Sequence, residues 1–149
     1  VTFDIYGLAG DADYWRAWQQ AIAQLPPNIT VTIHGAIPHE QVAAVLAEHH
    51  FFILPTLGEN FGHAILESLS VGCPVLISDQ TPWQNLSEHG AGWSLPLDQP
   101  DQWTEALRAC INMNDSEYAA MSACAYAFAA AWINDSDRVR EVREMLLNV

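Results

Sequence analysis

The chain has 149 residues, no lysine, five arginines and eighteen acidic residues, which gives a formal net charge of −13. So acidic a surface repels nucleic acid and anionic lipid, which excludes both as binding partners of this chain. Half of the residues are hydrophobic, yet no apolar run approaches the ~20 residues of a membrane-spanning helix, so we expect a soluble globular protein. The three cysteines, Cys73, Cys110 and Cys124, are too few and too scattered for a disulfide framework or a metal site. They are expected to be small core residues of a cytoplasmic protein.

The length of the chain predicts one domain with a substantial hydrophobic core. The first residue is Val1 rather than an initiator methionine, and the chain opens directly on a strand-like apolar pattern. We therefore expect a fragment of a longer protein.

Taken in order, the predicted elements alternate between strand and helix. Short apolar runs predict strands at residues 2–6, 29–33, 51–54 and 74–77, and a last short strand after the turn at residues 90–92. Amphipathic or alanine-rich stretches predict helices at residues 12–25, 40–48, 61–72, 103–113, 117–132 and 137–147, the last capped by residues 135–137. Strands that alternate with helices are typical of an α/β protein with a parallel sheet, whose strands are buried on both faces.

The loops that follow the strands are the expected ligand-binding positions, because ligands of open parallel sheets bind beyond the carboxyl ends of the strands. The loops at residues 7–10, 34–38, 56–61 and 78–83 follow four predicted strands, so we expect them to line one edge of the sheet. In the last of these loops, Trp83 either stacks on the face of a ligand or packs beneath the loop, and packing is the favoured interpretation.

The stretch from Glu59 to Glu67 joins the loop after the third strand to the start of a predicted helix. The first N–H groups of a helix have no internal acceptor, and together with the helix dipole they can bind an anion such as a phosphate. Gly62 lacks a Cβ, which lets a ligand or a neighbouring backbone come close. Carboxylates accept hydrogen bonds, so Glu59 and Glu67 suit a hydroxyl-rich ligand such as a sugar or a ribose. Alternatively, the two glutamates only complement the helix dipole or face solvent.

This stretch resembles the donor-binding signature of the retaining GT-B glycosyltransferases of family four. The resemblance rests on Glu59 and Glu67 with seven residues between them, on Phe61-Gly62 inside that interval, and on Gly72-Cys73-Pro74-Val75 after it. Ile33-His34-Gly35 upstream and Gly90-Ala91-Gly92 downstream extend the similarity to roughly residues 2–108. The resemblance implies an α/β fold with a Rossmann-like parallel sheet flanked by helices, which is the C-terminal half of a GT-B fold.

The resemblance also implies a role for each residue of the site. Glu67 would hold the ribose hydroxyls, and Glu59 would be catalytic and hold the donor sugar. The donor sugar and the diphosphate would be bound by Glu59, Asn60, Phe61, Gly62, His63 and Ala64. Gly35 and Ile37 would contact the base, mostly through their backbone, although Gly35 can equally serve only to turn the chain. No metal and no cofactor are expected, and the nucleoside-diphosphate sugar is the substrate.

On this interpretation, residues 1–149 form a single nucleotide-sugar-binding domain, and both the N-terminal acceptor domain and the first part of this domain are absent. That first part would carry an arginine and a lysine that clamp the diphosphate, which fits the absence of any arginine from the candidate loops. The full-length protein would be a cytoplasmic, metal-independent, retaining glycosyltransferase of the hexosyltransferase type, acting in bacterial polysaccharide or glycan biosynthesis. A glycan or another hydroxyl acceptor would bind through the missing domain. The fragment alone is expected to be inactive and not to bind membranes directly.

Two other classes of protein stay open. One is a GT-B-like epimerase or phosphorylase, although a phosphorylase needs a lysine for a Schiff base with pyridoxal and this chain has none. The other is a non-catalytic Rossmann-like binding module, in which Glu59 and Glu67 are ordinary surface residues.

Overall fold

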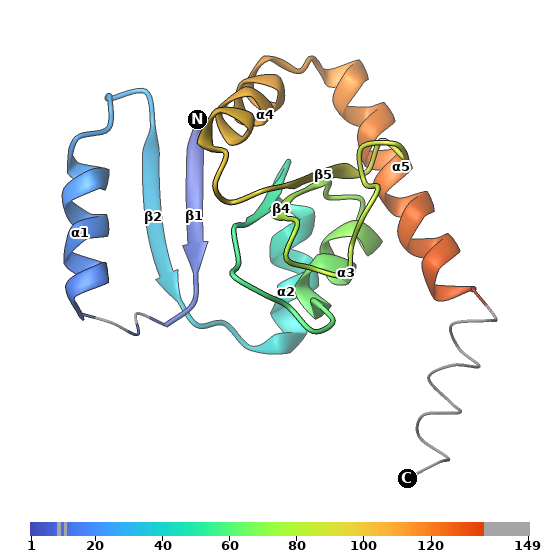
Figure 1. Cartoon of the computed structure of the whole chain (residues 1–149), viewed down its shortest axis with the longest axis horizontal. Coiled ribbons are helices and arrows are strands. Elements are labelled where there is room, and N and C mark those ends of the chain that lie inside the picture. Colours follow the sequence, from blue (N-terminus) through green and yellow to red (C-terminus); the bar gives the residue numbers. More distant parts are fainter. Residues whose placement is uncertain (9, 11, 136–149) are drawn as a thin grey trace, which may run out of the picture. The chain divides into compact units, whose positions relative to one another are not determined.

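The computed structural model describes residues 1–8, 10 and 12–135. The chain divides into two compact units, Val1–Val42 and Ala43–Val149 (Figure 1). The helix predicted at residues 137–147, with its cap at residues 135–137, lies outside the described residues except for Asp135.

The first unit is built on a parallel pair of strands, β1 (Thr2–Tyr6) and β2 (Thr30–Gly35), connected through helix α1 (Ala12–Ala23). The strands pair in register from Thr2 opposite Thr30 to Ile5 opposite Ile33, and an irregularity then places Tyr6 opposite Gly35. The predicted strand, helix and parallel strand are therefore confirmed. Helix α1 ends before Pro26 and Pro27, as expected for residues that have no N–H to continue a helix.

Helix α2 (His39–Ala47) runs across the division between the units, and the second unit continues with a three-stranded parallel sheet. Its strands are β3 (Phe52–Leu54), β4 (Val75–Ser78) and β5 (Gly92–Leu95), in the order β3-β4-β5. Three helices complete the unit: α3 (His63–Ser70), α4 (Pro100–Asn112) and α5 (Asp115–Ile133). The α/β class and the parallel strands predicted from the sequence are confirmed, but hydrogen bonding divides the strands between two sheets instead of one.

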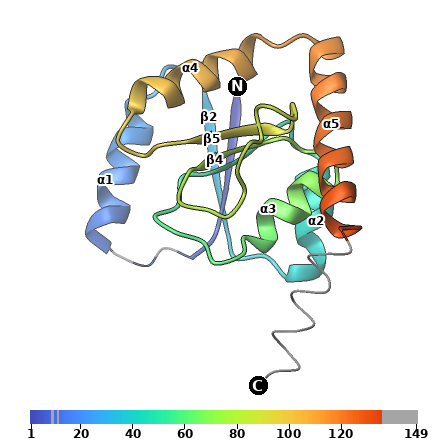
Figure 2. The same cartoon turned by 45° about the vertical axis from the view of Figure 1, so that its right-hand side comes forward.

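The core of the second unit lies where α3 and α5 pack side by side against the central strand (Figures 1 and 2). Every residue of β4 is buried, which confirms for this strand the expected burial on both faces. Ile65 and Leu69 of α3 and Ala125 and Ala129 of α5 are also almost completely buried. In contrast, β2 is mostly exposed, and Ile33 keeps 41% of its surface accessible.

Gly72 explains how α3 ends and why α5 can approach it. Gly72 has a φ of 75°, and the N–H of Cys73 donates to the carbonyl of Ser68 over 2.9 Å while the N–H of Gly72 donates to Leu69 over 3.0 Å. This pair of bonds is a Schellman motif, which requires a left-handed residue. A Cβ on Gly72 would lie 2.8 Å from the hydroxyl oxygen of Ser122 on α5, so a side chain there would push the two helices apart.

Among the described residues, no helix is both long and apolar enough to cross a membrane.

Candidate functional site

The start of α3 differs from the predicted helix in a way that matters for the site. The helix begins at His63 rather than at residue 61, because Gly62 has the left-handed angles φ 78° and ψ 60° and acts as the N-cap. No side chain caps the helix, and the Gly62 carbonyl accepts the N–H groups of Ile65 and Leu66 over 2.9 and 3.2 Å. The N–H groups of residues 61–64 have no hydrogen-bond acceptor in the part of the chain that the structure describes. These amides sit at the positive end of the helix dipole.

Gly62 is required for a reason that the sequence did not show. A Cβ at this position would lie 2.7 Å from Cδ1 of Ile65 and 3.2 Å from Nε1 of Trp83. Ile65 is fully buried, so it has little room to move aside. The space left by the missing side chain is therefore filled by the protein's own core.

The two glutamates lie on either side of this helix start in the sequence. Glu59 is half-buried in the preceding loop, and Glu67 is half-buried in the second turn of α3. Asn60 and His63 are exposed, and the ring of His63 lies 4.5 Å from the ring of Phe61. The structure thus brings residues 59–64 and Glu67 onto one loop and one helix, and their roles in binding stay a prediction.

The loop that carries Glu59 is joined to the loop after β4 by three hydrogen bonds. The Ser78 hydroxyl donates to the Thr56 carbonyl over 2.6 Å, and the Glu59 N–H donates to the Gln80 carbonyl over 3.1 Å. The indole N–H of Trp83 donates to the Phe61 carbonyl over 2.5 Å. The loops at residues 56–61 and 78–83 therefore form one hydrogen-bonded edge beyond β3 and β4, as the parallel arrangement predicts.

Trp83 packs under the loop, which confirms the favoured interpretation. Only 3% of its surface is exposed, and its ring lies 6.1 Å from Phe61, 6.4 Å from Phe128 and 4.9 Å from Trp132. Sequence reasoning missed Trp132 and the role of Ser78. A polar residue that ends a buried strand was the available signal for Ser78.

In the first unit, Gly35 turns the chain with a φ of 75°, and its carbonyl accepts the Gly7 N–H over 2.9 Å. Beside it, Nε2 of His34 lies 2.6 Å from a carboxylate oxygen of Asp4, and the His34 ring stacks on Tyr6 at 4.6 Å with an angle of 9° between the rings. The turning role of Gly35 is thus evident, whereas base binding by Gly35 and by the half-buried Ile37 stays a prediction. The expectation that all four loops line one edge also stays a prediction, since these two residues belong to the other unit.

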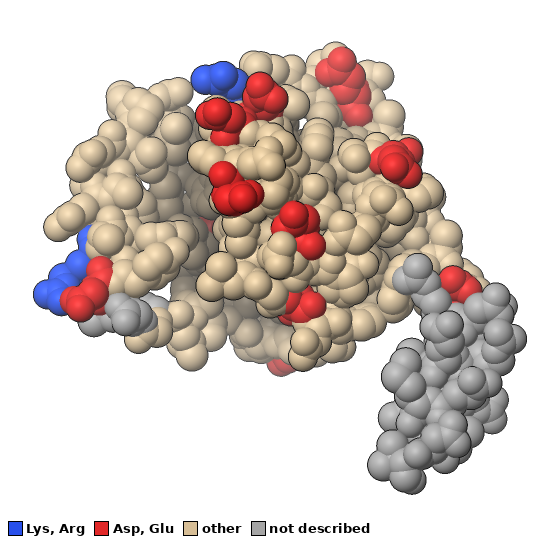
Figure 3. Space-filling model, viewed as in Figure 1, with Lys and Arg blue, Asp and Glu red and all other residues tan. Residues whose placement is uncertain are grey.

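The charges around the candidate loops are acidic. Figure 3 shows Asp and Glu side chains spread over the visible surface, with few basic ones. Of the two described arginines, Arg16 pairs with Asp13 on α1, and Arg108 lies on α4. The loops at residues 56–61 and 78–83 therefore contain no arginine, and an anion there would meet neutral donors such as backbone amides and the Asn60 side chain.

The expected absence of a metal stays a prediction. They contain no group of three or more His, Cys, Asp or Glu side chains that could hold an ion. However, carboxylates are common metal ligands, and the sequence has two pairs of aspartates one residue apart, at residues 11 and 13 and at residues 135 and 137. Residues 11 and 137 lie outside the described part, so these pairs do not enter the search.

The cysteines do not behave alike. Burial raises the pKa of the Cys73 thiol, and it raises the pKa of the Cys110 thiol to about 11, so both are inert thiols at neutral pH. Cys73 is the core residue that the sequence predicted, but Cys124 is exposed on α5, so that prediction is wrong for Cys124.

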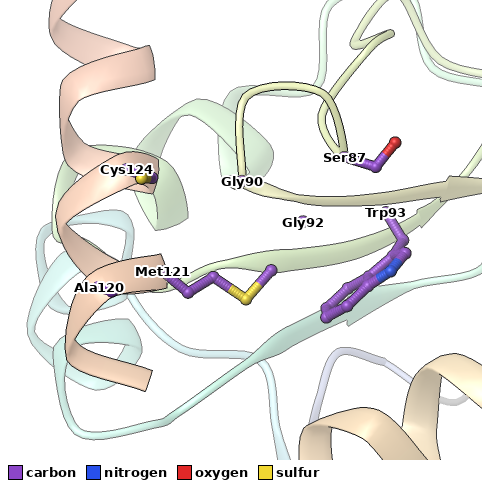
Figure 4. A pocket seen from close by; sticks show the side chains of 7 residues that line it. All are labelled: Ser87, Gly90, Gly92, Trp93, Ala120, Met121 and Cys124. Atoms are coloured by element: carbon purple, nitrogen blue, oxygen red, sulfur yellow. The ribbon is translucent and has the colours of Figure 1, made fainter. Parts of the chain in front are cut away.

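Two pockets of the second unit border helix α5. One pocket of about 340 Å³ is bordered by the side chains of Trp93 on β5 and Met121 on α5 (Figure 4). Another, of about 400 Å³, is bordered by α5 from Cys124 to Trp132, by Asp135 and by His89. Neither pocket is lined by any residue of the predicted site.

Parallel strands with helical crossovers, and a glycine-capped helix that follows a half-buried strand, define an α/β domain of the Rossmann-like class. Residues 1–113 match the family described as Glycosyl transferases group 1, which is most of the chain. The chain therefore belongs to the group 1 glycosyl transferases, and the resemblance seen in the sequence is confirmed.

Several curated relatives carry glycosyltransferase names. The chain is 23% identical to the GtfA subunit of a UDP-N-acetylglucosamine--peptide N-acetylglucosaminyltransferase from Streptococcus agalactiae, with 91% of this chain and 27% of that protein covered. It is 21% identical to the O-antigen chain mannosyltransferase RfbU of Salmonella typhimurium, with 77% and 32% covered. It is 26% identical to the amylovoran biosynthesis glycosyltransferase AmsK of Erwinia amylovora, with 95% and 36% covered. The chain thus spans about a third of the length of these relatives.

Proposed function

We propose that this chain is the donor-binding part of an enzyme that transfers a hexose from a nucleoside-diphosphate sugar to a hydroxyl acceptor with retention of configuration. The observation that carries the proposal is the start of α3, where the amides of residues 61–64 have no acceptor within the described residues and Glu59 and Glu67 flank them in the sequence. An anionic diphosphate beside hydroxyl-bearing rings has the chemistry that these groups recognise.

Each group has a distinct task in this proposal. Glu67 accepts hydrogen bonds from the ribose hydroxyls, and Glu59 accepts them from the donor sugar and is the catalytic carboxylate. The amides of residues 61–64 face the diphosphate, whose negative charge grows as it leaves the sugar. Donors fixed in place before the reaction stabilise such charge most effectively, because they need no reorganisation. The base is held in the first unit, by the backbone at Gly35 and Ile37.

The names of the relatives support the hexose and the bacterial glycan. One relative is named for UDP-N-acetylglucosamine, another for mannosyl transfer to O-antigen, and a third for amylovoran biosynthesis. The proposal includes a cytoplasmic, metal-independent reaction whose acceptor binds outside this chain, so the chain alone is inactive. Sugar transfer by residues 1–149 alone would contradict this part of the proposal.

The test is a calorimetric titration with UDP and with GDP. It compares the native full-length protein with its Glu67→Ala variant. Because the variant lacks a charged hydrogen-bond acceptor, its affinity for the preferred nucleotide should fall by about tenfold or more. The matched control is Glu105→Ala, an exposed acid on α4, which removes the same charge away from the site and should leave the affinity unchanged. Equal affinities for all three proteins would favour a non-catalytic module.

A further inference from the structure

The hydrogen bond between Trp83 and Phe61 does more than fill the core. The indole N–H reaches the Phe61 carbonyl over 2.5 Å from a ring that is only 3% exposed. The Phe61 carbonyl and the Gly62 N–H belong to the same peptide unit. A trans peptide is planar, and its carbonyl and N–H point in opposite directions. Fixing the carbonyl on the buried indole therefore aims the Gly62 N–H away from the indole.

The Gly62 N–H has no acceptor within the described residues, and it belongs to the N-cap of α3. We propose that Trp83 is a positioning residue of the transferase, which sets the orientation of the peptide between Phe61 and Gly62 so that the Gly62 N–H donates to the diphosphate of the donor. This inference rests on the proposed function and deepens it.

The surroundings of Trp83 hold the indole in the orientation that this role needs. Its backbone N–H donates to the Thr81 hydroxyl over 3.3 Å, and the Gln84 side chain donates to the Thr81 carbonyl over 2.6 Å. The ring of Trp132 lies 4.9 Å from Trp83 and 5.3 Å from Phe61, so it contacts both partners of the hydrogen bond. When the Trp83 indole and the Phe61 carbonyl are both held in place, the Gly62 amide is oriented before a ligand binds, as expected for a preorganised donor.

The sharpest variant is Trp83→Phe, which keeps an aromatic ring in the core and removes the N–H. Its matched control is Trp103→Phe. The indole of Trp103 donates to the Pro96 carbonyl over 3.0 Å, and neither residue belongs to the candidate loops. Both variants lose one bond from an indole to a carbonyl, and Trp83→Phe should lower the melting temperature more, because Trp83 is 3% exposed whereas Trp103 is half-buried. Only Trp83→Phe should lower kcat, by about tenfold, with a smaller change in the KM of the donor, because the charge on the diphosphate grows in the transition state.

These measurements use the full-length protein and separate the two proposals. A native protein that neither binds a nucleoside diphosphate nor transfers sugar overturns the proposed function. The other outcome is a native protein that binds the nucleotide and transfers sugar, while Trp83→Phe and Trp103→Phe show the same kcat. That outcome overturns the positioning role alone.

A second measurement needs no variant and covers the case in which Trp83→Phe does not fold. Phe61-Gly62 is the only Phe-Gly step in this chain. Labelling Phe carbonyls with carbon-13 and Gly amides with nitrogen-15 therefore selects the Gly62 amide of this chain in an NMR spectrum. Saturating UDP or GDP, whichever binds, should shift that amide proton downfield. An unshifted Gly62 amide at saturation overturns the inference.

Discussion

Two pairs of neighbouring strands in this chain end in loops, and the two pairs of loops are held together by different interactions. After β1 and β2, one backbone bond joins Gly7 to Gly35, and the nearby pair of His34 and Asp4 is partly exposed. After β3 and β4, one backbone hydrogen bond and two side-chain hydrogen bonds join the loops. The side-chain donors are Ser78 and Trp83, and both residues are buried. Burial decides how much such bonds contribute, because water competes for the exposed ones.

The contrast teaches how a binding edge is made rigid. A loop held by buried side chains is fixed by the core, whereas one held by backbone and surface groups keeps more freedom. In the proposed enzyme, the rigid edge faces the diphosphate, where charge changes during the reaction. On the same proposal, the base is held at the softer edge and takes no part in the chemistry.

The largest expected effect comes from replacing matched glycines in the two regions. Gly62 and Gly35 have nearly the same φ, 78° and 75°, so alanine is strained at both. A Cβ at Gly35 meets nothing within 4 Å, whereas one at Gly62 meets Ile65 at 2.7 Å. Gly62→Ala should destabilise the protein by about 2 to 4 kcal/mol, from strain plus overpacking, and Gly35→Ala by about 1 kcal/mol. Urea denaturation measures both, and equal losses would mean that the core around Gly62 can yield.

The next effect concerns a hydroxyl that joins the two loops of the second unit. Ser78→Ala removes the bond to the Thr56 carbonyl and should cost about 1 to 2 kcal/mol, because Ser78 is fully buried and the carbonyl loses its donor. Thr104→Ala serves as the control, since the Thr104 hydroxyl donates to the Pro100 carbonyl over 3.0 Å on an exposed turn of α4. There water replaces the lost bond, and the free energy of unfolding should change by less than about 0.5 kcal/mol. A similar loss for both variants would contradict the difference drawn from burial.

Local patterns were enough to predict the elements but not these bonds. The strand at Thr2–Tyr6 was predicted with its observed bounds, because an apolar run that ends at a glycine determines it locally. The helix predicted at residues 61–72 is shorter at both ends, since Gly62 and Gly72 have left-handed angles that no apolar period reveals. The amides and glutamates of the site were located by their position after a strand.

The partners of Trp83 could not be predicted in the same way. Phe61 is 22 residues away from it in the sequence, and Trp132 comes from a helix whose alanine-rich pattern gave no sign of a role at the site. Contacts of this kind depend on how α3, α5 and the loop after β4 pack, which is a property of the whole unit. Sequence reasoning therefore found the groups that would face a ligand and missed those that hold them.

The smallest expected effect lies at the softer edge, where the Asp4 carboxylate meets His34. The side chains keep 21% and 36% of their surface exposed, so solvent screens their interaction. At about pH 5, where an ordinary histidine carries a proton, Asp4→Asn should change the free energy of unfolding by less than about 1 kcal/mol, and added salt should shrink the difference from the native protein, as for other accessible ion pairs. The salt response distinguishes a charge effect from a packing effect, because loss of the stack between Tyr6 and His34 would persist at 1 M salt. A loss as large as that of Ser78→Ala would show that the first unit also fixes its loops through strong side-chain bonds, and the distinction between the two edges would then fail.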